Sequence, residues 1–182
     1  MHSATQTANP VWSLPVAVND VPAHGLDLTV SADAQTREAL RAFLGLPGLA
    51  RADAAFHIAR RGREGLRVTG EVRATVTQTC VVSLEPFEAD IVEKIDTDFA
   101  PPQAADARRP EGIEEEAAME EADPIVNGRV DLGALAAEHL ALGLDPYPRK
   151  PGATFKTSAA VEKTSPFAAL ESLANKAGRR ER

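Results

Sequence analysis

The chain has 182 residues, a formal net charge of -7 at pH 7 and a single cysteine, Cys80. A chain of this length can bury about two thirds of its unfolded surface, and one cysteine excludes an intramolecular disulfide framework. No apolar run is long enough for a transmembrane helix, and residues 1–10 lack the basic and apolar stretches of a signal peptide. We therefore expect a cytoplasmic protein with no membrane partner, built mainly as one domain.

The charges are divided unevenly along the sequence. Six arginines face three carboxylates between residues 51 and 73, fifteen carboxylates face four basic residues between 74 and 131, and eight basic residues face three glutamates from 149 onward. Basic segments on either side of an acidic middle can contact phosphate, but the solvated faces of an ordinary domain give the same pattern. Charge alone therefore names no partner.

The first part of the sequence combines short strands with one helix. Period-two alternation of apolar residues predicts strands over 11–18, 25–30 and 49–59. Ser31 or Asp33 can cap a helix over 33–44, and a Gly-Leu-Pro sequence follows its end. The turn after the third strand is predicted at 60–65.

Residues 66–99 carry the longest ordered pattern in the sequence. Apolar side chains favour even positions up to 84, and after Glu85-Pro86 they resume on odd positions. This alternation predicts one long, half-buried β-hairpin with Cys80 near its turn. Gly70 interrupts the first strand, which indicates a β-bulge or a bend in the sheet.

Residues 101–126 have a different composition. Two adjacent prolines lead into an alanine-rich and then strongly acidic run with few apolar side chains, so burial cannot offset the entropy lost on ordering. We expect a flexible acidic loop that interrupts a single domain of residues 10–150. Such a loop can mimic nucleic acid or hold basic proteins, or it can act only as a solubilising linker.

The predicted domain ends with a helix and a proline-rich segment. Asn127-Gly128 favours a turn, and Asp131 can cap a helix that runs to about Leu144. The prolines of 145–152 keep that segment extended, and we expect Tyr147 to pack it back on the sheet.

These elements together predict an α+β fold. Its centre is a twisted, mostly antiparallel sheet, either open or barrel-like, with the long hairpin at 66–99 and two or three packing helices. Residues 151–182 are expected to form a flexible tail with a short amphipathic helix at about 165–176.

The sequence offers little chemistry. It has no glycine-rich phosphate loop, no G-x-S-x-G and no H-E-x-x-H, and its four histidines are scattered one per segment. Cys80 falls at an apolar position of a strand, which is typical of an inert core cysteine. One cysteine without paired histidines does not provide the three or four ligands of a zinc site. We therefore predict no catalytic residue, no metal, no cofactor and no small-molecule substrate. An enzyme that uses Cys80 with a histidine stays as an alternative.

Two sets of residues are candidates for contact with macromolecules. Aromatic residues are only 4% of the chain, so a base-stacking platform is not expected and any RNA contact would be made to the phosphates. The candidate RNA contacts are Arg60, Arg61, Arg63, Arg67, Arg73, Arg149, Lys150, Arg179 and Arg180. The candidate protein-docking residues are Glu85, Pro86, Tyr147, Phe167 and Leu170.

Several stretches of the sequence resemble motifs of one family, in the family's order. They are Cys80-Val-Val-Ser-Leu-Glu-Pro86, the predicted helix from Asp131 to Leu142, the proline-rich segment 145–152, and Ser165-Pro-Phe-Ala-Ala-Leu-Glu-Ser-Leu173. The first resembles the C-x-R-C-L-E-P type motif of the YceD family of large ribosomal RNA subunit accumulation proteins. The form of 145–152 resembles the alphaproteobacterial branch of that family.

The resemblance implies a noncatalytic bacterial protein that supports accumulation or processing of large-subunit ribosomal RNA, by transient binding to precursor RNA or to ribosomal proteins. Direct RNA binding would use the arginine-rich turn and the tail, whereas protein binding would use the acidic loop and the helix that holds Phe167. Serine stands at position 83, where many members have a second cysteine, so a metal or redox role of that pair cannot apply here. A generic interaction module without a ribosomal role is the other alternative.

Overall fold

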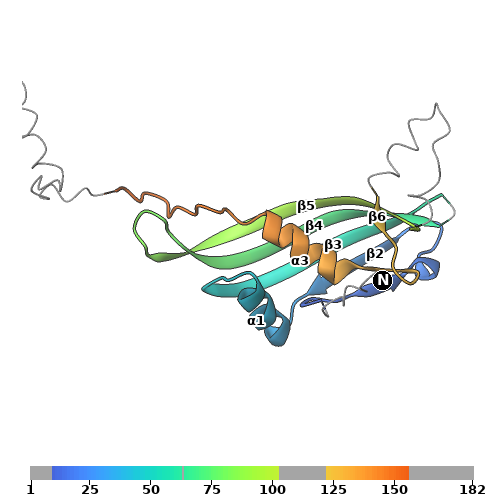
Figure 1. The fold of residues 1–182 in the computed structure, drawn as a ribbon, viewed down its shortest axis with the longest axis horizontal. Coiled ribbons are helices and arrows are strands. Elements are labelled where there is room, and N and C mark those ends of the chain that lie inside the picture. Colours follow the sequence, from blue (N-terminus) through green and yellow to red (C-terminus); the bar gives the residue numbers. More distant parts are fainter. Residues whose placement is uncertain (1–9, 63, 103–121, 156–182) are drawn as a thin grey trace, which may run out of the picture.

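The computed structural model describes residues 10–62, 64–102 and 122–155, and two helices and a large sheet make up most of this part (Figure 1). A short 3-10 turn, Val18–Asp20, follows the first strand. In chain order the strands and helices are β1 (Pro15–Ala17), β2 (Leu26–Ser31), α1 (Ala34–Phe43), β3 (Gly48–Arg61), β4 (Gly65–Thr79), β5 (Pro86–Ala100), β6 (Asp123–Pro124), β7 (Arg129–Asp131) and α3 (Leu132–Leu142).

The large sheet has the strand order β2-β3-β4-β5-β6, and β1 pairs separately with β7. Every pairing is antiparallel except that of β5 with β6. No pairing of described residues joins β2 to β6, so this sheet is open and does not close into a barrel. The predicted α+β class, with a mostly antiparallel sheet, is confirmed.

The long hairpin predicted at 66–99 is present as β4 and β5. Its register runs without a break from Leu66 opposite Phe99 to Thr79 opposite Pro86. A residue at an even position of β4 therefore lies opposite an odd position of β5, as the change of parity after Pro86 requires.

Gly70 does not mark a bulge, contrary to one of the two predictions for it. The register of β4 is continuous there with both β3 and β5, and the irregularity of the sheet lies instead between Leu49 and Arg51. A Cβ atom at Gly70 would lie 2.1 Å from the carbonyl oxygen of Ala55. Glycine is required because two strand backbones approach closely.

The two faces of the sheet differ in what covers them. The inner face carries buried side chains such as Val68, Val72 and Ile95, which share one core with Leu135 and Leu140 of α3. Helix α3 contacts β4 and β5, α1 contacts β3, and the β1–β7 pair contributes Val16 and Val130 to the same core. Figure 1 shows α3 lying across the sheet.

Helix α3 begins where Asp131 was predicted to cap it. The Asp131 carboxylate accepts hydrogen bonds from the backbone N–H groups of Gly133 and Ala134, at 3.0 and 3.1 Å. It also accepts one from the N–H of Leu14, which directly precedes β1, at 2.8 Å. A Cβ atom on Gly133 would lie 2.7 Å from the backbone nitrogen of Ser13. The cap and the glycine together fix α3 against the chain that leads into β1.

Three local expectations differ from the structure. The first strand spans only Pro15–Ala17 instead of 11–18, because it pairs only with the three residues of β7. The end of the predicted acidic loop contains β6, and Ile125 beside it is buried. Tyr147 is 72% exposed, so the prediction that it packs on the sheet is wrong.

Candidate interaction surfaces

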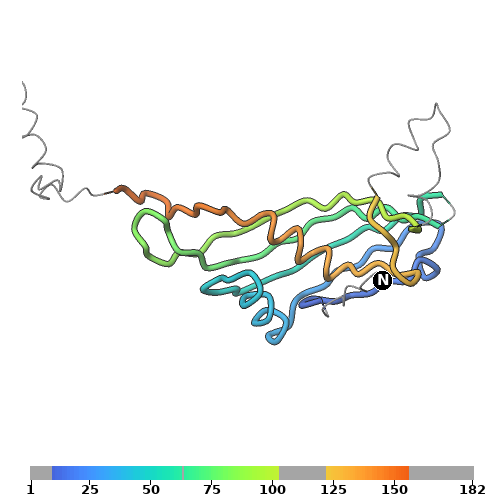
Figure 2. Tube along the Cα trace, viewed as in Figure 1, coloured from blue at the N-terminus to red at the C-terminus, as the bar shows by residue number. Residues whose placement is uncertain are grey.

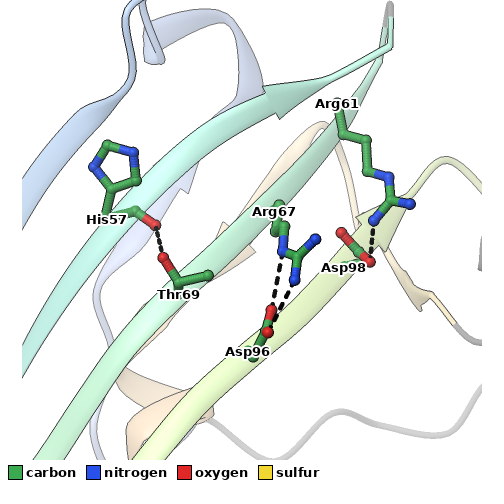
Figure 3. A network of polar contacts seen from close by, with 6 residues as sticks. All are labelled: His57, Arg61, Arg67, Thr69, Asp96 and Asp98. Atoms are coloured by element: carbon green, nitrogen blue, oxygen red, sulfur yellow. Dashed lines mark hydrogen bonds and ion pairs between the residues drawn. The ribbon is translucent and has the colours of Figure 1, made fainter.

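The outer face of the large sheet is polar, and oppositely charged side chains cross it in pairs. Arg67 on β4 donates two hydrogen bonds to Asp96 on β5, at 3.0 and 2.9 Å, and Arg61 on β3 is paired with Asp98 (Figure 3). The hydrogen bonds from Arg67 lower the pKa of Asp96 below its ordinary value. Two of the arginines named as candidate RNA contacts, Arg61 and Arg67, are therefore paired with carboxylates on the outer face.

Further polar pairs lie within β4 and between β3 and β2. Arg73 donates to Glu71 at 2.8 Å, and His57 Nδ1 lies 2.7 Å from the Asp27 carboxylate on β2. Thr69 donates weakly to the backbone oxygen of His57, at 3.4 Å, beside a shallow, open depression over Gly70. These groups satisfy one another on the outer face.

The candidate RNA contacts do not form one patch. Arg61, Arg67 and Arg73 share the outer face with their carboxylate partners. Arg60 instead donates to the backbone oxygen of Val21 at 2.7 Å. Arg149 is exposed, and Lys150 is paired with Glu85 in the turn of the hairpin. The remaining three candidates, Arg63, Arg179 and Arg180, lie outside the described residues.

The turn between β4 and β5 is a compact loop that encloses the thiol of Cys80. Cys80 N–H donates to the Glu85 oxygen and Leu84 N–H donates to the Cys80 oxygen, each at 2.9 Å. The backbone N–H groups of Val82 and Ser83 donate to Cys80 Sγ at 3.4 Å. Hydrogen bonding from Ser83, followed by the backbone N–H groups, lowers the pKa of the Cys80 thiol from 9.0 to about 7. The Cys80 side chain is nevertheless fully buried.

The proline-rich segment runs from α3 to this turn, beside the hairpin (Figure 2). Val81 N–H donates to the Pro148 oxygen at 2.9 Å, and the Gln78 side chain donates to the Asp145 oxygen at 3.3 Å. Lys150 Nζ lies 2.9 Å from the Glu85 carboxylate. The candidate docking residues Glu85, Pro86 and Tyr147 thus belong to two segments that contact each other, whereas Phe167 and Leu170 lie outside the described residues.

Exposed apolar side chains also gather in these two segments. We call Val81, Leu84 and Tyr147 the hairpin-tip surface. Leu84 is 76% exposed and holds a positive φ of 60°, a conformation that is uncommon for leucine. Val81 and Leu84 were not among the candidates from the sequence, because Leu84 continues the even-numbered apolar positions expected to be buried and Val81 lies among them.

Among the described residues, no three histidine, cysteine, aspartate or glutamate side chains are grouped so that they could hold a metal ion. No helix in the described ranges is long and apolar enough to cross a membrane.

Comparison with known proteins gives one match. Neither the curated proteins nor the solved structures contain a match to this chain. A family model described as large ribosomal RNA subunit accumulation protein YceD matches residues 68–174, which is more than half of the chain. The match begins in β4 and includes the hairpin, the Cys80 turn, α3 and the proline-rich segment. The chain therefore belongs to the YceD family, whose name links it to the accumulation of large-subunit ribosomal RNA.

Proposed function

We propose that this chain is a noncatalytic bacterial factor of the cytoplasm that supports accumulation or processing of large-subunit ribosomal RNA, and that it acts by transient binding to a component of the large subunit. The family match across the hairpin and α3 is the observation that carries this proposal. The family's name concerns the accumulation of the RNA. The mode of binding is inferred from the surfaces of this chain.

Binding to a ribosomal protein is the mode that the surfaces favour over binding to naked precursor RNA. Binding to nucleic acid is favoured when lysine or arginine side chains of the protein neutralise phosphates and release the counterions condensed on them. The described arginines of the outer face instead have carboxylate partners within the same face, and the chain as a whole carries a charge of -7. An acidic protein of this kind attracts basic proteins and repels nucleic acid.

A binding role also fits the state of Cys80 better than catalysis does. A nucleophilic cysteine needs an accessible thiolate as well as a lowered pKa. The Cys80 thiol has the lowered pKa but no exposed surface. We infer that its hydrogen bonds hold the turn of the hairpin in shape.

A pull-down of the tagged full chain from its native cytoplasm, with and without ribonuclease, tests the proposal. We expect large-subunit ribosomal proteins to stay bound after ribonuclease treatment. Retention of precursor RNA that disappears together with all proteins on ribonuclease treatment would instead support direct RNA binding. Recovery of neither class would refute the proposed function.

A further inference from the structure

The long edge of β5 carries backbone groups that point away from the sheet. Ile125 N–H donates to the Ala100 oxygen, so the backbone of Ala100 faces the β6 side, and Cys80 N–H donates to the Glu85 oxygen, so the backbone of residue 85 faces β4. Backbone direction alternates along a strand, and the register of β5 has no break. Even-numbered residues of β5 therefore direct their N–H and C=O groups outward.

Most of this edge has no strand beside it. β6 pairs only with Phe99 and Ala100, and no other described residue pairs with the outer side of β5. The outward residues Glu88, Asp90, Val92, Lys94 and Asp96 are all exposed. Long, regular and unpaired edges are unusual in stable monomers because they are templates for a further strand.

The charges at this edge select the kind of strand that can be added. The side chains of the outward residues stand on the outer face, where a new strand would place its own side chains opposite them. Glu88 and Asp90 have no cationic partner among the described residues, and Val92 between them and Lys94 is 54% exposed. Lys94 is the one basic residue among these five. A strand with cations opposite Glu88 and Asp90 would complete the edge.

The sequence that follows β5 points to the same partner. The segment between β5 and β6 contains Glu114, Glu115 and Glu116. Pairing of two copies through this edge would bring together two chains that each carry a charge of -7. Charge complementarity therefore favours a basic partner over a second copy.

We propose that an extended segment of a basic protein binds the edge of β5 as an added strand, with its backbone paired to the outward groups of Glu88, Asp90, Val92 and Lys94. This inference rests on the proposed function for the class of partner, and it names the surface that such a partner uses. Backbone pairing supplies the affinity, and the lysine or arginine side chains opposite Glu88 and Asp90 supply the selectivity.

The test uses the full chain and a synthetic nine-residue peptide in which lysine and threonine alternate. One control peptide has glutamate in place of lysine. A second control keeps every lysine but has all its amides N-methylated, which retains the charge and removes the donors needed for strand pairing. Binding is measured by calorimetry, and hydrogen exchange is followed at the amides of Glu88, Asp90, Val92 and Lys94.

A matched pair of proline variants separates the edge from the rest of the fold. The Val92 N–H points outward, so Val92→Pro leaves the ladder with β4 intact. Thr29→Pro is the control on the opposite edge of the sheet. Ala32 N–H donates to the Ala52 oxygen across β2 and β3, so the Thr29 N–H also points outward.

We expect the lysine peptide to bind and to protect the four amides. Its affinity should fall about fivefold with Val92→Pro but not with Thr29→Pro, because the proline removes one outward N–H donor. Equal binding of the N-methylated peptide would overturn the proposal in favour of charge attraction alone. Protection of the same amides by raising the concentration of the chain, without peptide binding, would overturn it in favour of a second copy. Unchanged exchange at the wild-type amides refutes it even if Val92→Pro fails to fold. The peptide contains no ribosomal component, so these outcomes are independent of the pull-down.

Discussion

At the scale of single residues, Gly70 is the position where the backbone leaves no room for a side chain. An ideal Cβ there would lie 2.1 Å from the Ala55 oxygen, and the strands on both sides are held in register. We predict that Gly70→Ala lowers the free energy of unfolding by about 1–3 kcal/mol, because the sheet must shift to admit the methyl group. Urea unfolding measures this. The control is Thr79→Ala at an exposed position, whose free energy of unfolding should stay within about 0.5 kcal/mol of wild type. An equal loss of stability in Gly70→Ala and Thr79→Ala would contradict the close approach of the strands.

Cys80 links the hairpin turn to pH. Its pKa falls from 9.0 to about 7 in the folded chain, chiefly through the hydrogen bond with Ser83. A depressed pKa contributes stability that is fully present above the unfolded value and is lost as the pH falls through the folded value. We predict that wild type gains stability relative to Cys80→Ala between about pH 6 and about pH 9.5. Urea unfolding of both proteins at the two pH values measures the difference.

Ser83→Ala provides the control for this prediction, because it removes the largest cause of the lowered pKa while it keeps the thiol. Its gain in stability over the same pH range should be smaller than that of wild type. A gain that is identical in wild type, Ser83→Ala and Cys80→Ala would show that other groups produce the pH dependence.

Residue-level properties that depend on local pattern could be predicted from the sequence, and those that depend on distant partners could not. The burial of Cys80, the residue after the end of β4, follows from its even position, which continues the alternation of that strand. The pairing of Arg67 with Asp96 depends on the β4–β5 register, which brings together residues far apart in the chain. Tyr147 is exposed because backbone hydrogen bonds of Asp145 and Pro148, and not an aromatic contact, hold its segment at the turn.

At the scale of elements, the two capped helices provide a matched comparison. Asp33 accepts one cap bond, from Thr36 N–H at 2.7 Å, and its pKa is lowered chiefly by that bond. Asp131 caps α3 through two N–H groups and also accepts from Ser13 Oγ and Leu14 N–H. The second cap therefore joins α3 to the segment before β1, whereas the first acts only within α1.

We predict that Asp131→Ala lowers the free energy of unfolding by about 2 kcal/mol, at the upper end for a helix cap, because it leaves four donors without their acceptor. Asp33→Ala should cost less. Urea unfolding of the two variants gives the comparison, and hydrogen exchange at Leu14 should rise only in Asp131→Ala. Equal costs, with Leu14 still protected, would mean that the link between α3 and β1 does not depend on this carboxylate.

The element boundaries show which signals in the sequence were sufficient. Parity and the change at Glu85-Pro86 predicted the hairpin, and the polar cap with an apolar stripe predicted α1 and α3. β1 and β6 are short and owe their pairing to partners from distant parts of the chain, which no local pattern encodes. The free edge of β5 had no signal for the same reason, since an edge is defined by the strand that is missing beside it.

At the scale of the whole molecule, the distribution of charge is the reason for proposing a protein and not RNA as the partner. The sheet pairs its arginines with carboxylates, the acidic run is attached between β5 and β6, and the total charge is -7. In the sequence alone, without their carboxylate partners, the same arginines are candidates for binding phosphate. The strand register places Arg61 and Arg67 beside carboxylates of β5, and Arg73 is paired with Glu71 of its own strand, which is why we propose protein binding.

This argument leads to a test on the salt dependence of binding. We predict that replacing Arg61, Arg67 and Arg73 together by glutamine leaves retention of large-subunit ribosomal proteins unchanged, because these arginines already neutralise carboxylates of the same face. If the three arginines bound RNA phosphates, the slope of log affinity against log salt for purified precursor RNA would fall by about 2–3 in the variant, close to 1 for each contact. Titration of wild type and variant with that RNA over a range of salt concentrations measures the slope. Thermal unfolding of both chains confirms that the loss of the ion pairs leaves the fold intact, so that an unchanged slope can be assigned to the surface.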